Sequence, residues 1–505
     1  MISATGRERI KSDYAAYLGD ESKLSGFADE IYFPESCAEL SDTLRLLKGR
    51  RLSVTLSGAR TGIVGGAVPE GGAVVSTEKL IAPPLVFPGE GGGYYVRVGP
   101  GTTLDVLNSF LHDCSFPDGN KYFFPVDPTE GSASIGGIVA TNASGSRSYR
   151  FGSLRHNLAA LTVILADGLL VRLEKGKTVL TNGCFKYNTA GGGQVSFDMP
   201  RYVCPAVKNN AGYYFSEGMD LIDLFAGSDG TLGAVAEADL ILKPRPEVIL
   251  SVLAFFDTEK NSQGFVRDLR TDNRVVSIEY FDSNSLGMLA GLAQNGTSIA
   301  GMPVPEPIPG SLAAIYFEYG LNENETESAF EAFSALLEKH GSGLDMTWGG
   351  ADDKEMLRLK SFRHAVPEAV NTYLGSVKRT YPGIHKMSTD LAVPVASEME
   401  MFDAYNEVLA GSGMKYVVFG HIGECHLHVN LLPADPADMI RAVDLYSKLV
   451  DHAIALGGTV SAEHGIGKLK KKYLSRMYPQ SDIDAMLKVK RHFDPGLILN
   501  PGNIF

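Results

Sequence analysis

The sequence predicts an α+β protein made of two parts that differ in rhythm. In the first half, short apolar runs of strand length are separated by clusters of glycine, and the chain holds 56 Gly in 505 residues. After residue 246, strand-like runs alternate with longer segments of helical spacing. Such alternation is typical of one sheet with helices on one face, and we expect that layer in the second part.

The first part is predicted to contain mainly strands. Their expected positions are 51–56, 73–76, 94–98, 158–166, 169–173 and 234–242, and residues 104–114 have helical spacing. Asp167 and Gly168 form a hairpin turn signal between two of these strands. We expect a long surface loop or lid over 178–214, which is rich in Gly, Asn, Thr and Tyr.

Pro244 and Pro246 mark the boundary with the second part, because proline interrupts regular structure. Strands are expected at 248–256, 277–281, 313–319 and 416–419. Helices are expected at 259–269, 326–339, 354–374 and 439–456. The tail from residue 461 onward is again marked by Gly and Pro.

The composition excludes several classes of function. The chain carries 46 Lys+Arg and 59 Asp+Glu, a formal net charge of −13, which argues against a nucleic-acid partner. Its five Cys form no CxxC pair, so we expect reduced thiols, no iron–sulfur cluster and a cytoplasmic location. We expect no cleaved signal peptide, and the best apolar stretch, 158–171, is too short to span a bilayer. Peripheral association with a membrane stays open.

Glycine-rich segments far apart in the sequence could wrap one long cofactor. They cover 56–66, 125–152, 227–233 and 499–502. The first follows a predicted strand, yet it has neither the lysine of a nucleoside-triphosphate loop nor the GxGxxG of a Rossmann turn. Its backbone N–H groups could instead hold a diphosphate, and a purely structural loop is the alternative.

Histidine is concentrated in one short segment, where His421, His426 and His428 fall within eight residues. A flat strand would place His421 and His428 on opposite faces, but a kink at 423–425 would bring both to one site. Imidazoles suit Zn²⁺ and other first-row divalent metals, and histidines without a ligand are the alternative. Glu463 and His464 follow in a second polar segment that ends in glycines.

The motifs SGxxTGxxGGxxP, PxDP, IGGxxATNASG with FG, GSDGTLG, GHxGxxxLHxN, EHGIG and LNPG occur in this order. This order resembles the FAD-linked 2-hydroxyacid dehydrogenases of the vanillyl-alcohol-oxidase type, which include glycolate oxidase flavin subunits and D-lactate and D-2-hydroxyglutarate dehydrogenases. The resemblance implies a PCMH-type FAD-binding domain of two subdomains at 1–246. It also implies an inserted cap of antiparallel sheet and helices at 247–460, and a return to the FAD domain at 461–505.

The resemblance further implies which residues hold FAD. The implied residues are Ser57, Gly58, Ala59, Arg60, Thr61, Gly62, Gly65, Gly66, Pro125, Asp127, Ser134, Ile135, Gly136, Gly137, Thr141, Asn142, Gly145, Gly152, Gly230, Gly233, Val235 and Asn500. The first loop contains neither the His nor the Cys that attaches FAD in some relatives, so we expect non-covalent FAD.

By the same resemblance, the second part carries the reaction. His421, His428 and Glu463 are the implied ligands of a divalent metal, Zn²⁺ first, with Mn²⁺ or Fe²⁺ as alternatives. His464 is the implied catalytic base, and Arg363, Lys386 and Asn430 are the implied contacts to substrate. A small D-2-hydroxy acid would pass its hydride to flavin N5. The electrons would reach a non-NAD acceptor, which is a quinone, an electron-transfer flavoprotein, a cytochrome or a partner subunit. A homodimer is consistent with this picture.

Three departures from the family pattern affect the substrate and the metal. The family commonly reads GHxGDGNLH, whereas this chain has Glu424, Cys425 and His426, so His426 offers an extra ligand or a new polar contact. Pro367 stands where some relatives carry a substrate-binding Thr, and the spacing from Arg363 to Lys386 is long. We therefore expect D-lactate rather than a dicarboxylate. The alternatives are glycolate or another 2-hydroxy acid, an oxidase that uses O₂, or a non-catalytic flavin subunit of a complex.

Overall fold

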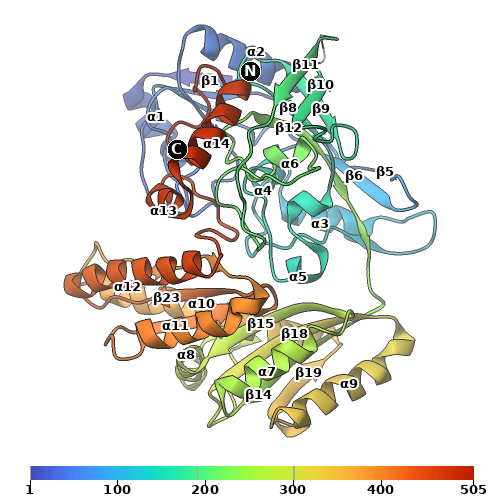
Figure 1. Ribbon diagram of the computed structural model, residues 1–505, viewed down its shortest axis with the longest axis vertical. Helices are drawn as coiled ribbons and strands as arrows, with labels where there is room; N and C mark the ends of the chain where they lie inside the picture. The colour runs from blue at the N-terminus through green and yellow to red at the C-terminus, as the bar shows by residue number, and fades with distance from the viewer. Residues whose placement is uncertain (1, 190, 300–301) are drawn as a thin grey trace.

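Two small sheets of short strands form the N-terminal part of the computed structural model, which describes residues 2–189, 191–299 and 302–505 (Figure 1). The first has the order β1 (Ile2–Thr5), β2 (Glu30–Phe33), β4 (Ala73–Ser76), β3 (Val54–Ser57), and its last three strands are parallel. The second has the antiparallel order β5 (Leu85–Pro88), β6 (Tyr94–Val98), β12 (Ala234–Ile241), β8 (Leu158–Ile164), β9 (Leu170–Glu174). All of β8 is buried, which explains its nearly unbroken apolar sequence.

Short helices connect these strands. They are α1 (Arg7–Asp13), α2 (Cys37–Gly49), α3 (Leu104–Asp113), α4 (Ile135–Ala140), α5 (Ser148–Phe151) and α6 (Ile222–Phe225). The hydroxyl of Ser36 caps α2, and that of Thr103 caps α3. The helix expected over 104–114 is thus confirmed, and its start has a local cause.

The segment predicted as a surface loop or lid contains a hairpin with one buried face. The hairpin consists of β10 (Cys184–Asn188) and β11 (Gln194–Asp198), whose Phe185, Tyr187 and Phe197 are buried. The segment does reach the surface, but the prediction of a loop was wrong for the hairpin, because its Gly- and Asn-rich composition marks turns between strands with buried aromatic side chains.

One antiparallel sheet forms the C-terminal part. Its order is β19 (Thr347–Gly350), β14 (Val248–Phe256), β18 (Ala313–Leu321), β15 (Val275–Asp282), β22 (Tyr416–Gly420), β23 (His426–Leu431), β20 (Met387–Ser388), and β21 (Leu391–Ala392) also pairs with β23. Two small pairs lie apart, β7 (Tyr122–Phe123) with β13 (Lys243–Pro244) and β16 (Ser298–Ile299) with β17 (Met302–Pro303). The four strands expected here are all present.

Helices cover both faces of this sheet, whereas the sequence predicted them on one. The helices α7 (Glu259–Leu269), α9 (Thr326–Lys339), α11 (Glu398–Leu409) and α12 (Pro436–Ala455) share a core with Val252 and Phe256, while α8 (Ser283–Gln294) and α10 (Asp353–Lys378) pack with Leu253 and Phe255. Because β14 is apolar on both sides, its sequence shows no alternation that would reveal the second layer. Within the described residues, no helix has the length and apolar character to cross a membrane.

The C-terminal tail lies against the N-terminal part, as Figure 1 shows for α13 (Lys471–Met477) and α14 (Gln480–Phe493). Leu499 forms a bridge to Val54 beside the first sheet. The buried Lys490 donates to the carbonyls of Thr231 and Leu499 at 2.6 and 2.9 Å. Residues from both ends of the chain therefore meet in one place.

Candidate functional site

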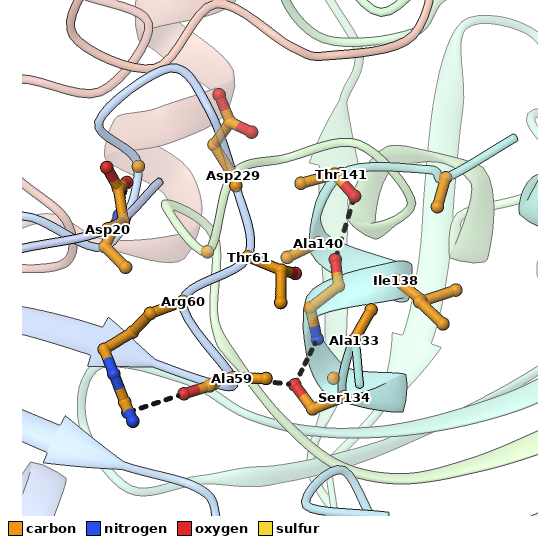
Figure 2. A pocket seen from close by; sticks show the side chains of 18 of the residues that line it. Asp20, Ala59, Arg60, Thr61, Ala133, Ser134, Ile138, Ala140, Thr141 and Asp229 are labelled. Atoms are coloured by element: carbon orange, nitrogen blue, oxygen red, sulfur yellow. Dashed lines mark hydrogen bonds between the residues drawn. The ribbon is translucent and has the colours of Figure 1, made fainter. Parts of the chain in front are cut away.

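A cleft is lined by all four glycine-rich segments together with His421, Glu463 and His464 (Figure 2). Sixteen of the residues predicted to hold FAD line it: Ser57, Gly58, Ala59, Arg60, Thr61, Gly62, Gly66, Ser134, Gly136, Gly137, Thr141, Gly145, Gly230, Gly233, Val235 and Asn500. Segments that are far apart in the sequence thus form one continuous surface.

The other residues predicted for FAD do not line the cleft. They are Gly65, Pro125, Asp127, Ile135, Asn142 and Gly152. The carboxylate of Asp127 accepts from Ser146 Oγ at 3.1 Å and from the backbone N of Arg147 at 3.2 Å. Asn142 Oδ1 accepts from the backbone N of Arg155 at 2.8 Å. In this structure both side chains support the loops from behind.

Close backbone approach explains two of the glycines. A Cβ on Gly145 would lie 2.1 Å from the backbone oxygen of Asp127, and one on Gly58 would lie 2.4 Å from Ser134 Oγ. That hydroxyl also accepts from the backbone N of Ala59 at 3.2 Å, a contact drawn in Figure 2. The result is a wall of N–H groups and hydroxyls without a lining lysine among the described residues, which suits a diphosphate.

Asn500 joins the tail to this wall. Its Oδ1 accepts from the backbone N of Leu56 at 2.7 Å, and its Nδ2 donates to the carbonyl of Asp229 at 2.8 Å. The carboxyl group of Asp229 is buried, and burial raises its pKa to about 6. The tail residue therefore fixes two of the glycine-rich segments against each other.

Residues 421–428 have the kink that the histidine spacing called for. After β22 ends at Gly420, Ile422–Glu424 forms a single 3₁₀ turn, Cys425 has a φ of +52°, and β23 begins at His426. This left-handed conformation favours glycine, so cysteine adopts it at a conformational cost. Leu427 is buried.

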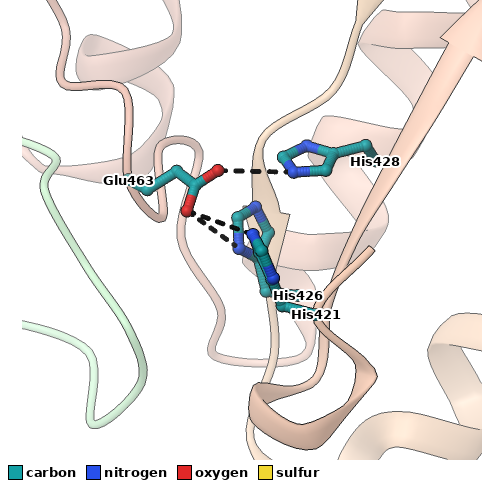
Figure 3. Close-up of side chains that lie close together, drawn as sticks. All are labelled: His421, His426, His428 and Glu463. Atoms are coloured by element: carbon teal, nitrogen blue, oxygen red, sulfur yellow. Dashed lines mark ion pairs between the residues drawn. The ribbon is translucent and has the colours of Figure 1, made fainter. Parts of the chain in front are cut away.

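The kink directs three imidazoles at the carboxylate of Glu463 (Figure 3). His421 Nε2 lies 3.5 Å from Oε2, His428 Nε2 lies 3.3 Å from Oε1, and His426 Nδ1 lies 3.9 Å from Oε2. One ligand atom from each of the four residues lies within 4.8 Å of the others. Two atoms bound to one ion at 2.0–2.2 Å lie about 3.0–4.4 Å apart, so this set could hold a divalent metal.

The outward nitrogens of two of these rings have oxygen partners, as metal-binding histidines usually do. His421 Nδ1 lies 2.7 Å from Glu279 Oε1, and His428 Nδ1 lies 3.2 Å from the carbonyl oxygen of Thr389. Burial opposes the charge on Glu279, but Arg363 and His421 outweigh it and lower its pKa to about 2. Burial likewise opposes the charge on His421, but Glu279 raises its pKa to about 9. Glu279 is therefore a charged support for the site.

Asp390 is a buried support for His464 that carried no signal in the sequence. Its Oδ2 lies 3.2 Å from His464 Nδ1 and accepts from Ser461 Oγ at 2.7 Å and Lys470 Nζ at 2.6 Å. Burial raises the pKa of Asp390, but His464 and Lys470 overcome that effect and hold it well below its ordinary value. His464 Nε2 is left facing Glu463, at 3.5 Å from Oε1.

The three residues predicted to contact substrate lie in different settings. Arg363, on α10, has its Nε 3.5 Å from Glu279 Oε2. Asn430 lies on the same strand face as His428, and its buried Oδ1 has no hydrogen-bond partner within the described residues. Lys386 is exposed ahead of β20, outside the cleft lining.

Contacts to Glu463 from the N-terminal part were missed in the sequence. Lys208 Nζ lies 3.0 Å from Oε2 of Glu463 and 3.0 Å from Oε2 of Glu424. Ser144 Oγ donates to Glu463 Oε2 at 3.0 Å, and Asn210 Nδ2 donates to its carbonyl at 2.9 Å. Lys208 and Asn210 belong to the segment interpreted as a lid, and no motif distinguishes them there.

Comparison with known proteins shows relatives along the whole chain. Residues 28–174 match the FAD binding domain, and residues 245–504 match the C-terminal domain of the FAD linked oxidases. A D-2-hydroxyglutarate dehydrogenase from Xanthomonas citri pv. viticola is 31% identical over 94% of this chain and 89% of its own. A probable mitochondrial D-lactate dehydrogenase from Danio rerio is 28% identical over 98% and 92%. The glycolate oxidase subunit GlcD of Bacillus subtilis is 27% identical over 100% and 96%.

Solved structures support the fold alone. An alkyldihydroxyacetonephosphate synthase superposes with a TM-score of 0.62 at 14% identity, covering 95% of this chain and 77% of that one. The predicted α+β class with a PCMH-type FAD-binding domain is thereby confirmed. Since the second family match alone covers more than half of the residues, the chain belongs to the FAD-linked oxidase family, with an FAD-binding domain in its N-terminal part.

Proposed function

We propose that the protein oxidises a D-2-hydroxy acid, D-lactate as the first choice, to the 2-oxo acid with non-covalent FAD and a divalent metal. One observation carries this proposal. The cleft of the glycine-rich segments is also lined by His421, Glu463 and His464, so cofactor and proton-accepting groups share one space. Relatives named for D-lactate, glycolate and D-2-hydroxyglutarate support this class of substrate.

The residues present fit both groups. Bound FAD supplies the acceptor for the hydride that leaves Cα of the substrate. His421, His428 and Glu463 would hold a divalent ion, which would lower the pKa of the substrate hydroxyl. The geometry of His421 and His428 supports the fit to a metal. One nitrogen of each ring faces Glu463, and the other nitrogen lies against an oxygen atom on the outer side.

The chain's own residues handle the proton and the carboxylate. Asp390 holds the Nδ1 side of His464, which leaves Nε2 as the atom that accepts the substrate hydroxyl proton. Arg363 binds the substrate carboxylate, because its guanidinium has N–H groups beyond the Nε that lies 3.5 Å from Glu279 Oε2. Asn430, whose buried Oδ1 has no hydrogen-bond partner within the described residues, is the further polar contact to substrate. We give Lys386 a lesser part because, unlike Arg363 and Asn430, it is exposed.

The test is an anaerobic titration of the FAD-loaded, metal-loaded protein with D-lactate, read from the flavin absorption band. L-lactate, glycolate and D-2-hydroxyglutarate serve as comparisons. We expect one D-acid to bleach the band, and we expect His464→Asn to slow the bleaching about 10²–10⁴-fold. His112→Asn, on the exposed side of α3, is the matched control that stays at the wild-type rate.

The outcomes separate the alternatives. A flavin that no 2-hydroxy acid reduces would contradict the proposal and favour an electron-transfer subunit. Reduction by glycolate alone would replace D-lactate as the substrate but keep the chemistry. Rapid reoxidation of the reduced flavin by air would identify an oxidase.

A further inference from the structure

His426 is the most deeply buried member of the histidine cluster. It opens β23, and its exposed fraction is 0%. Its Nδ1 has no hydrogen-bond partner in the part of the chain that the structure describes. A buried polar atom without a partner is costly, so such a ring calls for an explanation.

The ring lies between two carboxylates. Its Nδ1 faces Glu463, 3.9 Å from Oε2, and its Nε2 lies 3.1 Å from Asp390 Oδ1, an ion-pair distance. Its centroid lies 4.6 Å from that of His428 and 5.4 Å from that of His421. The ring thus belongs to the cluster drawn in Figure 3 and is not a neighbour of it.

His426 repeats the arrangement of the other two rings. In His421 and His428, Nε2 faces Glu463 and Nδ1 meets an oxygen on the outer side. In His426 the nitrogens exchange places, with Nδ1 facing Glu463 and Nε2 against an oxygen of Asp390. One inward and one oxygen-supported nitrogen is the usual state of an imidazole that binds a metal.

We infer that His426 is a fourth protein ligand of the divalent metal, bound through Nδ1 and oriented by Asp390. The inference rests on the metal centre proposed above, to which it adds a ligand. The contacts of Glu463 with the three rings, 3.3, 3.5 and 3.9 Å, all fall within the range of about 3.0–4.4 Å allowed to atoms on one ion.

A fourth ligand changes which metal suits the site. Four protein ligands complete the tetrahedral shell that Zn²⁺ prefers, which is the pattern of structural zinc sites. A substrate that binds through its hydroxyl and carboxylate then needs two more positions. Octahedral ions such as Mn²⁺ provide them, so we expect flavin reduction to be faster with Mn²⁺ than with Zn²⁺.

The test counts metal-bound imidazoles in the FAD-loaded, full-length protein. The protein is labelled with ¹⁵N-histidine, stripped of metal with a chelator and titrated with Zn²⁺, and long-range ¹H–¹⁵N spectra are recorded. We expect three imidazoles to shift in the wild type, two bound through Nε2 and one through Nδ1. In His426→Asn, which restores the usual residue of the family, the Nδ1-bound signal is absent and two remain.

Affinity for Mn²⁺, measured by competition with a chromophoric chelator, gives a second readout. Loss of an outer partner costs about 10–100-fold in metal affinity, so we expect His426→Asn to lose at least about 100-fold. His428→Asn is the matched loss of a neighbouring ligand and should weaken binding to a similar degree. The wild-type spectrum alone decides the ligand count if a variant does not fold.

The outcomes separate this inference from the proposed function. Two Nε2-bound imidazoles in both the wild type and His426→Asn would overturn the fourth ligand and leave the metal centre intact. No imidazole shift on addition of Zn²⁺ would overturn the metal centre, and this inference with it. Bleaching of the flavin by a D-acid without metal would then show that the oxidation depends neither on the metal centre nor on His426 as its ligand.

Discussion

The carboxylate of Asp390 organises the site, and replacing it with an amide of the same shape tests that role. Its Oδ2 accepts from Ser461 Oγ, from Lys470 Nζ and from the backbone N of His464, the last at 3.0 Å. Its Oδ1 accepts from the backbone N of Glu463 at 3.1 Å. In Asp390→Asn, one oxygen becomes an NH₂ donor, and every group around either position is itself a donor.

The structure sets the size of two effects of Asp390→Asn, one on stability and one on the rate of flavin reduction. Lys470 would keep a buried ammonium without its anion, and breaking a buried pair in this way costs about 3–5 kcal/mol. The amide would also cease to hold the Nδ1–H side of His464, so the ring would lose the tautomer in which Nε2 accepts a proton. That loss removes a general base, worth about 10²–10⁴-fold in the rate of flavin reduction.

The assay combines thermal unfolding with stopped-flow reduction of the flavin in Asp390→Asn, Lys470→Met and the double variant. The double variant removes the unpaired ammonium, so most of the stability should return while the rate stays low. Equal recovery of rate and stability would refute the reasoning. Asp390 would then act only as the partner of Lys470, and the orientation of His464 would not depend on it.

Further predictions concern other parts of the chain. Asp282 caps α8 while buried, which raises its pKa from 3.8 to about 6. Because the folded state holds this proton more tightly than the unfolded state, the free energy of unfolding falls as the pH rises from about 4 to 6. By urea unfolding, Asp282→Asn should therefore be about 3 kcal/mol more stable than wild type at pH 8, and no more stable at pH 3.5. Gly145→Ala should weaken FAD binding at least about tenfold in a fluorescence titration, since its Cβ would meet the backbone oxygen of Asp127, whereas Gly375→Ala, with open space around it, should not. Glu279→Gln should weaken Mn²⁺ binding about 10–100-fold by chelator competition, and unchanged affinity would contradict its place behind the imidazole.

Local patterns predicted most of the helices and strands, and they named some of the residues that the structure brings together in the candidate site. The helix at 326–339 is visible because its apolar residues recur at helical spacing, and the kink before His426 follows from the positions of two histidines. The second helical layer was missed because β14 is apolar on both sides, so its pattern does not show two covered faces. Glu279 and Asp390 were missed for another reason. They support histidines that are far away in sequence, and a single buried carboxylate carries no motif.

Glu463 shows why the site is a property of the whole fold. From one side its carboxylate meets the imidazoles of the C-terminal sheet, and from the other it accepts from Ser144, in a segment that lines the cofactor cleft. The buried ammonium of Lys208 lies beside Oε2 of Glu463. Burial raises the pKa of Glu463, but Lys208 and His421 outweigh that effect and hold the pKa well below its ordinary value. A change in the charge or position of this one carboxylate is therefore felt by both parts. If a metal bound at Glu463 changes the affinity of the cleft for FAD, linkage requires FAD to change the affinity for the metal by the same factor.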